Sequence, residues 1–261
     1  MRQVTLAHCL LLCASCAASP PLAPSDASWG GARDPSVAPE AAAPILPPVD
    51  PAQRVEQVVK IVTHRLDGDP VGSGFLLCRV ENVVYVLTAF HVLTGEHWRG
   101  EAGGAMALDS VQRVEVLFRG GSPRFEGELV AFDPQFSEED DLALLMVRVP
   151  PSFASSAVRL GDSAKLAPAA PLIAVGHVSE ALQEDWVTRR GAVARLDKFI
   201  TFEPALSAGY SGGPIFNERG AVVGVTREVL GEGLTRAVRI ERIVEFAAGW
   251  MPRSCVLEND R

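Results

Sequence analysis

A serine framed by glycine residues is the part of this chain whose residue types point most clearly to chemistry. The run Gly209–Pro214 reads Gly-Tyr-Ser-Gly-Gly-Pro and places the hydroxyl of Ser211 on a turn with glycine on both sides. Gly209 permits backbone angles that are closed to other residues, and it lets a substrate approach the main chain. The N–H groups of Gly209 and Ser211 can then point at one spot, where an oxyanion could form. We therefore predict Ser211 as a nucleophile, with the N–H groups of Gly209 and Ser211 as its oxyanion hole.

Two further segments supply the groups that a serine nucleophile requires. His91 follows Thr88-Ala89-Phe90 at the end of an apolar strand, and Asp141 directly precedes a second apolar strand. A nucleophile, a base that takes its proton and an acid that orients the base are the three parts of an acyl-transfer site. The sequence predicts that His91 is the base and Asp141 the acid. Asp140 is the alternative acid, because residues 138–141 form an acidic run and such runs usually lie on solvated loops.

The order of these residues along the chain resembles that of the trypsin-like (chymotrypsin-fold) serine peptidases. Two other well-known triads place the serine or the aspartate first. Smaller matches resemble the bacterial HtrA-like branch: they are Gly72-Ser73-Gly74-Phe75, Asp133-Pro134 and Ala237–Ile240. The resemblance covers roughly residues 55–250. It implies two β-barrels, with His91 and Asp141 on the first, Ser211 on the second, and the active site in the cleft between them.

Short apolar runs separated by turn residues predict an all-β fold from about Arg54 onward. Together with the resemblance, this pattern predicts two packed six-stranded antiparallel β-barrels with a C-terminal helix. Residues Asn217–Gly220 predict a hairpin turn, and apolar residues at helical spacing predict a helix over Ile240–Trp250. The expected strands are Val58–Thr63, Gly74–Val80, Val83–Thr88, Val114–Phe118, Leu129–Phe132 and Leu142–Val149, followed by Leu172–Val175, Val187–Leu196, Phe199–Phe202, Pro214–Phe216 and Ala221–Thr226.

The chain begins with a segment that has the composition of an export signal. Residues 1–17 combine a positively charged start, an apolar centre and small residues, which predicts a signal peptide. Residues 18–53 are rich in proline and alanine and predict a disordered linker. The run Cys13–Cys16 resembles a bacterial lipobox, although Cys13 stands where leucine is usual, so we expect either lipidation at Cys16 or a cut after Ala17 or Ala18. The protein is expected to be exported, as a periplasmic or cell-envelope lipoprotein or as a secreted protein.

The remaining domain boundaries follow from where this patterning stops. We expect the trypsin-like protease domain over residues 54–251 and a C-terminal tail over residues 252–261. No second domain is expected after Ile243, so the peptide-binding PDZ domain that many HtrA-like proteases carry is not expected.

Composition and cysteine spacing argue against several classes of partner. The net charge of −8 argues against a general nucleic-acid partner. The mature chain has no stretch of about 18 uninterrupted apolar residues, so no membrane span is expected. It lacks an H-E-x-x-H motif and paired C-x-x-C motifs, so we expect no metal and no other cofactor. Cys78 and Cys255 either form a disulfide in an oxidising compartment or stay separate, with Cys78 as a small buried side chain.

The resemblance also implies which residues meet the substrate. In the family, the residue six positions before the nucleophile lies at the base of the primary specificity pocket. Here that residue is Ala205, which favours cleavage after small or medium apolar side chains over Lys or Arg, although the acid Glu203 is close by. Val225-Thr226-Arg227 is expected to form the wall that pairs with the substrate backbone, and Ala237 to line the far side.

Tyr210 departs from the pattern of the digestive members of the family. Those enzymes carry an aspartate at this position, which pairs with an N-terminal amine that zymogen cleavage releases. A tyrosine has no charge near neutral pH and cannot make that pair. We therefore expect the active site to assemble without proteolytic activation, and Ile61 to lie in the core of the first strand.

Three functions remain open from the sequence. The leading hypothesis is an exported serine endopeptidase that hydrolyses protein or peptide substrates through a covalent acyl-enzyme. The second is a non-catalytic binding module with the same fold, which the intact set of His91, Asp141 and Ser211 disfavours. The third is an esterase or other acyl hydrolase; its usual G-x-S-x-G motif lies on a strand-to-helix turn, whereas Pro214 and a β-hairpin follow Ser211 here. The sequence leaves the oligomeric state open.

Overall fold

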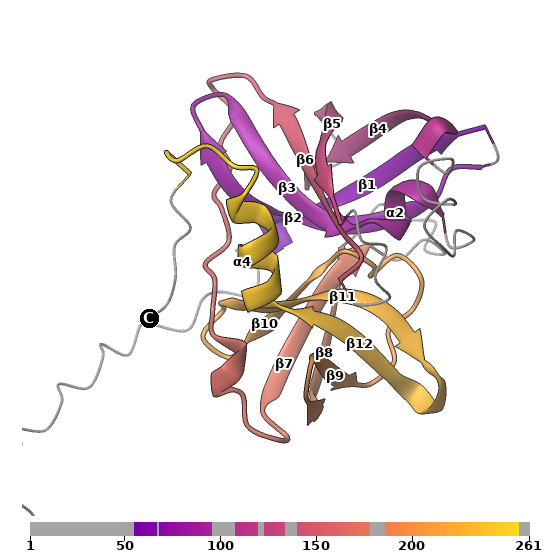
Figure 1. The fold of residues 1–261 in the computed structure, drawn as a ribbon, viewed down its shortest axis with the longest axis vertical. Helices are drawn as coiled ribbons and strands as arrows, with labels where there is room; N and C mark the ends of the chain where they lie inside the picture. Colours follow the sequence, from indigo (N-terminus) through magenta and orange to yellow (C-terminus); the bar gives the residue numbers. More distant parts are fainter. Residues whose placement is uncertain are drawn as a thin grey trace, which may run out of the picture. The chain divides into compact units, whose positions relative to one another are not determined.

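The computed structural model describes residues 55–66, 68–95, 108–119, 123–133, 140–177 and 186–255. The ribbon in Figure 1 shows these residues in colour. The expected signal peptide, the linker, Cys16 and the residues after Cys255 lie outside the described residues, as does Pro134. In the described part of the chain, no helix is long and apolar enough to cross a membrane.

Six antiparallel strands close the first barrel, in the order β1-β2-β3-β6-β5-β4. Closure gives every strand of this barrel a hydrogen-bonded neighbour on both sides. The interior is filled by apolar side chains that include Val59, Ile61, Leu76, Val86 and Leu145. The strand bounds are β1 Val58–Arg65, β2 Val71–Val80, β3 Val83–Ala89, β4 Val111–Leu117, β5 Arg124–Phe132 and β6 Leu142–Arg148.

The second barrel repeats this topology, with the strand order β10-β11-β12-β9-β8-β7. Its interior contains Leu172, Val193, Phe202 and Ile215, all buried. The predicted hairpin turn is confirmed, because Asn217 N–H donates to the carbonyl of Ala221 (2.9 Å) between two paired strands. The strand bounds are β7 Pro171–His177, β8 Trp186–Leu196, β9 Phe199–Glu203, β10 Pro214–Asn217, β11 Val222–Leu230 and β12 Leu234–Arg239.

One strand, β12, was not among the expected strands. Its sequence, Leu-Thr-Arg-Ala-Val-Arg, carries two arginines and so lacks the continuous apolar run that marks the other strands. It is nevertheless a full member of the second barrel, because it pairs with β11 on one side and β9 on the other. The fold class of two six-stranded antiparallel barrels is confirmed.

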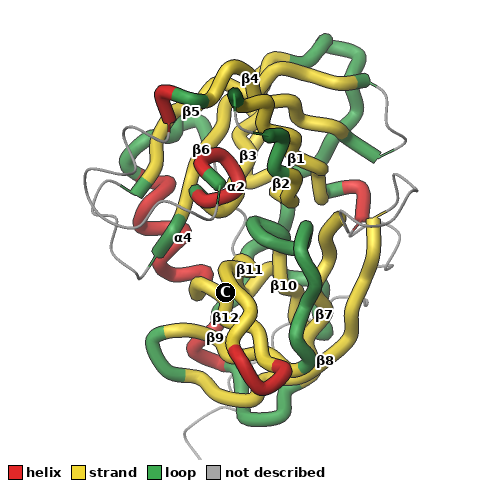
Figure 2. Tube along the Cα trace, turned by 90° about the vertical axis from the view of Figure 1, so that its right-hand side faces the viewer, coloured by secondary structure: helices red, strands yellow, loops and turns green. Residues whose placement is uncertain are grey.

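A third apolar cluster joins the two barrels. It contains Phe75 and Leu144 from the first barrel together with Phe216 and Val225 from the second, all buried. The buried face of the C-terminal helix α4 (Ile240–Ala248) belongs to the same cluster. Figures 1 and 2 show α4 running beside both barrels, so this helix packs where the barrels meet. The helix ends two residues before the expected Trp250, within the usual uncertainty of helix ends.

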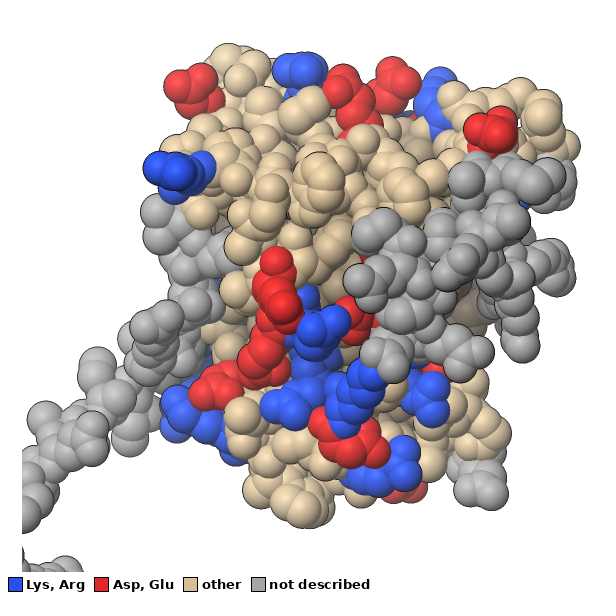
Figure 3. All heavy atoms as spheres, in the orientation of Figure 1, with Lys and Arg blue, Asp and Glu red and all other residues tan. Residues whose placement is uncertain are grey.

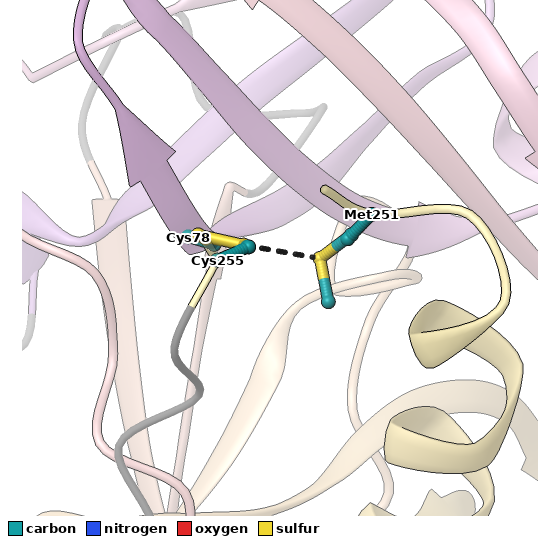
Figure 4. Close-up of a disulfide and its surroundings, with 3 residues drawn as sticks. All are labelled: Cys78, Met251 and Cys255. Atoms are coloured by element: carbon teal, nitrogen blue, oxygen red, sulfur yellow. Dashed lines mark hydrogen bonds between the residues drawn. A yellow bond between two sulfur atoms is a disulfide. The ribbon is translucent and has the colours of Figure 1, made fainter. Parts of the chain in front are cut away.

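A disulfide attaches the segment after α4 to the first barrel. Cys78 on β2 is bonded to Cys255, with their Cα atoms 5.8 Å apart, which decides between the two alternatives that the sequence left open. Figure 4 shows this bond beside Met251, whose Sδ atom lies 3.5 Å from Sγ of Cys255. The chain that follows the second barrel is therefore covalently tied to the first one.

Candidate active site

Strand pairing brings His91 and Asp141 together. β3 and β6 are antiparallel neighbours, and Ala89 at the end of β3 faces Leu142 at the start of β6. His91, two residues after Ala89, begins the short helix α2 (His91–Thr94), while Asp141 directly precedes Leu142. The Nδ1 atom of His91 lies 2.6 Å from Oδ2 of Asp141, and the backbone N–H of His91 donates to Oδ1 at 3.0 Å. Both carboxylate oxygens of Asp141 thus contact the same histidine.

The backbone of Asp141 has an uncommon conformation that suits this contact. Its φ is 49°, in the left-handed region that aspartate and asparagine tolerate better than most residues. The carbonyl of Asp141 also accepts from the N–H of Phe90 at 2.9 Å, so the residue is held at both its backbone and its side chain. A carboxylate can only accept at Nδ1, so Nδ1 carries a proton, and in a neutral imidazole Nε2 is then the acceptor.

The alternative acid, Asp140, makes a different contact. Its Oδ1 accepts a hydrogen bond from Nε of Arg242 on α4 at 3.3 Å, and its Oδ2 pairs with Nη2 of the same guanidinium. The contact with His91 therefore belongs to Asp141, and Asp140 faces the C-terminal helix.

The turn that carries Ser211 is tied to both barrels through its backbone. Ser73 N–H on β2 donates to the carbonyl of Ser211 (2.8 Å), and Gly212 N–H donates to the carbonyl of Thr226 on β11 (2.8 Å). Gly212 has a φ of 79°, and a Cβ there would lie 2.2 Å from the carbonyl oxygen of Ser73. Glycine is therefore required on this side of the serine by the close approach of β2.

The backbone donors expected for an oxyanion hole are the N–H groups of Gly209 and Ser211. Gly209 has a φ of 96°, and within the described residues its N–H and that of Ser211 make no hydrogen bond to the protein. The side chain of Ser211 is partly exposed, so the turn is accessible from solvent. Among the described residues, no protein group thus competes with a ligand oxygen for these two N–H groups.

The hydroxyl of Ser73 links this turn to the start of the second barrel. It donates to the carbonyl of Gly209 (2.6 Å) and accepts from the backbone N–H of His177 at the end of β7 (2.8 Å). The hydroxyl of Thr88 in turn donates to the carbonyl of Ser73 (2.7 Å). The sequence analysis used Gly72–Phe75 only as a family marker and missed this contact, because no local pattern indicates a partner more than a hundred residues away.

Tyr210, next to Ser211, is directed into the protein interior. Its side chain is buried in the core of the second barrel, and burial raises the pKa of its phenol, opposed in part by the charge of Arg189. The phenol therefore keeps its proton at ordinary pH. Ile61 is fully buried in β1, as predicted.

The residues expected to meet the substrate differ in accessibility. Val225, Thr226 and Ala237 are buried, whereas Ala205 is partly exposed and Glu203 is exposed. Thr226 uses its own N–H on the carbonyl of Gly213 (2.9 Å) and its carbonyl on the N–H of Gly212, so its backbone groups are already bonded to the nucleophile turn. Substrate pairing along this strand would therefore begin after Thr226.

The guanidinium of Arg227 lies close to Asp141. The sequence analysis named Arg227 only as part of the expected substrate-binding wall and gave its charge no role. Its Nε lies 4.0 Å from Oδ2 of Asp141, and its side chain is 11% exposed. The guanidinium also stacks over Phe199, 5.6 Å from the ring centroid, and its Nη1 lies 3.6 Å from Glu228. Figure 3 shows basic and acidic side chains intermingled over the second barrel and beside α4, in keeping with such pairs. A cation thus lies next to the carboxylate that contacts His91.

Over the ranges described above, no three His, Cys, Asp or Glu side chains come together as metal ligands would.

Comparison with known proteins gives the family. The family model of the trypsin-like peptidase domain matches residues 72–225, which include His91, Asp141 and Ser211. A probable periplasmic serine endoprotease, DegP-like, from Pseudomonas putida is 27% identical over 195 residues, covering 69% of this chain and 35% of the relative. A magnetosome formation protease, MamE, from Magnetospirillum gryphiswaldense is 29% identical over 203 residues, covering 70% of this chain and 23% of the relative. The chain thus spans about a third of the length of these curated relatives, or less. With two six-stranded barrels and a matching domain, the chain belongs to the trypsin-like peptidase family.

Proposed function

We propose that the protein is a serine endopeptidase that uses Ser211 as nucleophile, His91 as general base and Asp141 as the acid that orients His91. The observation that carries the proposal is the two-point contact between His91 and Asp141, at 2.6 and 3.0 Å, in a chain of the trypsin-like peptidase family. In a Ser-His-Asp site this contact fixes the ring and the tautomer that can accept the serine proton. The names of the relatives, which are serine endoproteases, support the same activity.

The reaction follows from the groups on these elements. Oγ of Ser211 bonds to the substrate carbonyl carbon while its proton passes to Nε2 of His91. The N–H groups of Gly209 and Ser211 hold the oxyanion, which is where such sites gain much of their rate. The C–N bond then breaks, the leaving amine takes the proton from His91, and an acyl-serine remains. Water adds to this ester through the same base, and the acid product leaves with Ser211 restored.

The substrates would be proteins or peptides cleaved after small or medium apolar residues. Ala205 supports this preference because it presents a methyl group where a basic side chain would need a carboxylate, and Glu203 is exposed to solvent. A basic side chain that lost its water at such a site would find no counter-charge. Val225 and Thr226 would support the wall of the substrate site, Arg227 would offer its backbone to the substrate, and Ala237 would line the far side.

Export would place the protein in the periplasm, on the cell envelope or outside the cell. The disulfide between Cys78 and Cys255 supports this, since disulfides persist in oxidising compartments. Residues 1–17 would be the signal and residues 18–53 the linker to the protease domain at 54–251. A lipid on Cys16 would tether the domain to a membrane, and Cys16→Ser would then move the protein from the membrane fraction to the soluble one.

Peptides that differ only in the residue before the cut test this proposal. We expect kcat/KM for Ala, Val or Leu to exceed that for Arg or Lys by about tenfold or more, the scale of one missing charge partner in a buried site. A preference for Arg would contradict the proposed pocket. Hydrolysis of simple esters without any peptide cleavage would favour the acyl-hydrolase alternative, and no turnover of either would favour a binding module.

A further inference from the structure

The residue before the proposed catalytic acid is held by the C-terminal helix. Asp140 and Arg242 are 102 positions apart, yet the carboxylate meets the guanidinium through both of its oxygens. The side chain of Asp140 is only 12% exposed. The pKa of Arg242 is raised by its hydrogen bond to Asp140 and by nearby acidic charges, with burial acting in the opposite direction. A fork of this kind fixes direction as well as charge, because the planar guanidinium must face the carboxylate squarely.

The helix that presents Arg242 is itself anchored at both ends. At its start, the carboxylate of Glu241 accepts from the N–H (2.8 Å) and the hydroxyl (2.5 Å) of Ser163. Along its length, Ile243 and Ala247 are buried in the cluster that joins the barrels. After its end, Cys255 is bonded to Cys78 on β2. Arg242 therefore lies on a helix whose position is fixed relative to both barrels.

Asp141 is the residue that needs such support. Its left-handed backbone, with a φ of 49°, is less favourable than a strand conformation, so the surrounding contacts have to hold it. Two of those contacts are hydrogen bonds from Phe90 and His91, which lie on the first barrel. The fork between Asp140 and Arg242 adds a third restraint, from α4, directly before Asp141 in the chain. It also engages the neighbouring carboxylate, so that only Asp141 is available to His91.

We propose that Asp140 and Arg242 are a positioning pair, through which the C-terminal helix sets the geometry of Asp141 and hence of His91. The inference rests on the proposed catalytic role of Asp141. Asp140 and Arg242 act through Asp141 and have no role as proton carriers. Loss of the pair should therefore lower kcat more than it raises KM, since a displacement of a catalytic group by about 1 Å can lower the rate about 100-fold.

The decisive variant removes both charges. Arg242→Met alone leaves a buried carboxylate without its partner, and the resulting loss of stability would obscure the result. Asp140→Asn/Arg242→Met leaves no buried charge unpaired, because the remaining partner of Arg242, Glu245, is exposed, so its Tm should stay within a few degrees of the parent. We expect the kcat of the double variant to fall about 10- to 100-fold, with KM changed less than about threefold. The kcat of Arg242→Lys should lie between that of the parent and that of the double variant.

A matched control is available on the same side chain. Arg242 also pairs with Glu245 (2.8 Å), whose side chain is 72% exposed. Glu245→Gln removes that second partner and should leave kcat and KM unchanged, because exposed pairs contribute little. If the pair between Asp140 and Arg242 is merely structural, the double variant will regain the Tm that Arg242→Met loses, and its kcat will lie within about twofold of the parent. That result would show the proposal to be wrong.

A spectroscopic readout separates this inference from the proposed function. The proton on Nδ1 of His91, held by Asp141, should give an NMR resonance far downfield of the amides in the parent and in Glu245→Gln. In the double variant this resonance should shift or broaden, at a temperature well below Tm. If the parent shows the resonance but cleaves no peptide, the proposed function fails while the positioning pair is still tested. An unchanged resonance in the double variant would overturn the positioning role.

Discussion

Replacing Asp141 with asparagine isolates the chemical role of the carboxylate at His91. Asparagine adopts the left-handed backbone that Asp141 requires, with φ at 49°, so the loop should keep its path. Its amide oxygen can still accept from the backbone N–H of His91, where Oδ1 now accepts at 3.0 Å. The amide nitrogen then faces Nδ1, where Oδ2 now lies at 2.6 Å, and it can only donate. The proton of the imidazole must move to Nε2, which can no longer accept the proton of Ser211.

The expected loss is large for a change of one atom. The same exchange in a Ser-His-Asp site lowers kcat by about 10⁴, which corresponds to about 5.4 kcal/mol in the barrier at about 1.36 kcal/mol per decade. The assay is kcat at saturating peptide, with Tm measured in parallel. We expect Tm within a few degrees of the parent, since the backbone and one hydrogen bond are kept. A kcat within about tenfold of the parent, in a folded variant, would refute the assigned role of Asp141.

Three further perturbations test the framework around the site. Cys255→Ser should lower the free energy of unfolding by about 2–5 kcal/mol in urea titrations, because the disulfide closes a loop of 177 positions; an unchanged midpoint would contradict this. Gly212→Ala should abolish activity or folding, because a Cβ would lie 2.2 Å from the carbonyl oxygen of Ser73, whereas Gly231→Ala, with open space around it, should behave like the parent. Tyr210→Phe should flatten the alkaline loss of stability: the raised pKa means that the folded chain holds the phenolic proton more tightly than the unfolded chain, so the free energy of unfolding falls as pH rises above about 10. Equal slopes for parent and Tyr210→Phe between pH 9 and 11 would contradict the burial argument.

The contact between His91 and Asp141 could be predicted because both residues adjoin strands that the sequence marks clearly. The apolar runs of β3 and β6 are buried along nearly their whole length, so their identification required no knowledge of the other barrel. The hairpin turn at Asn217–Gly220 could also be predicted locally, from its turn-forming residues. The sequence left two candidates for the acid, Asp140 and Asp141. Only the positions of His91 and Arg242 show that Asp141 faces the histidine.

Other features depend on contacts between distant segments and left no mark in the local sequence. The strand β12 contains polar residues and therefore lacks the apolar run by which the other strands were recognised. One of them, Arg236, stacks its guanidinium 5.1 Å from the ring centroid of Phe199, a contact that the sequence does not reveal. Arg227 is recognisable as a neighbour of Asp141 only after β11 has been placed against the first barrel. The disulfide joins residues 177 positions apart, and spacing alone could not distinguish it from two separate cysteines.

The central claim is that Ser211 is a nucleophile activated by His91, and covalent labelling tests it most directly. The parent, with its N-terminus uncut near Ile61, is treated with a fluorophosphonate and the adduct is located by peptide mass spectrometry. A single adduct on Ser211, absent from Ser211→Ala and formed at least about 100-fold more slowly in His91→Ala, is the result we predict. Labelling that is absent from the folded parent, or that proceeds equally well in His91→Ala, would contradict the proposed mechanism.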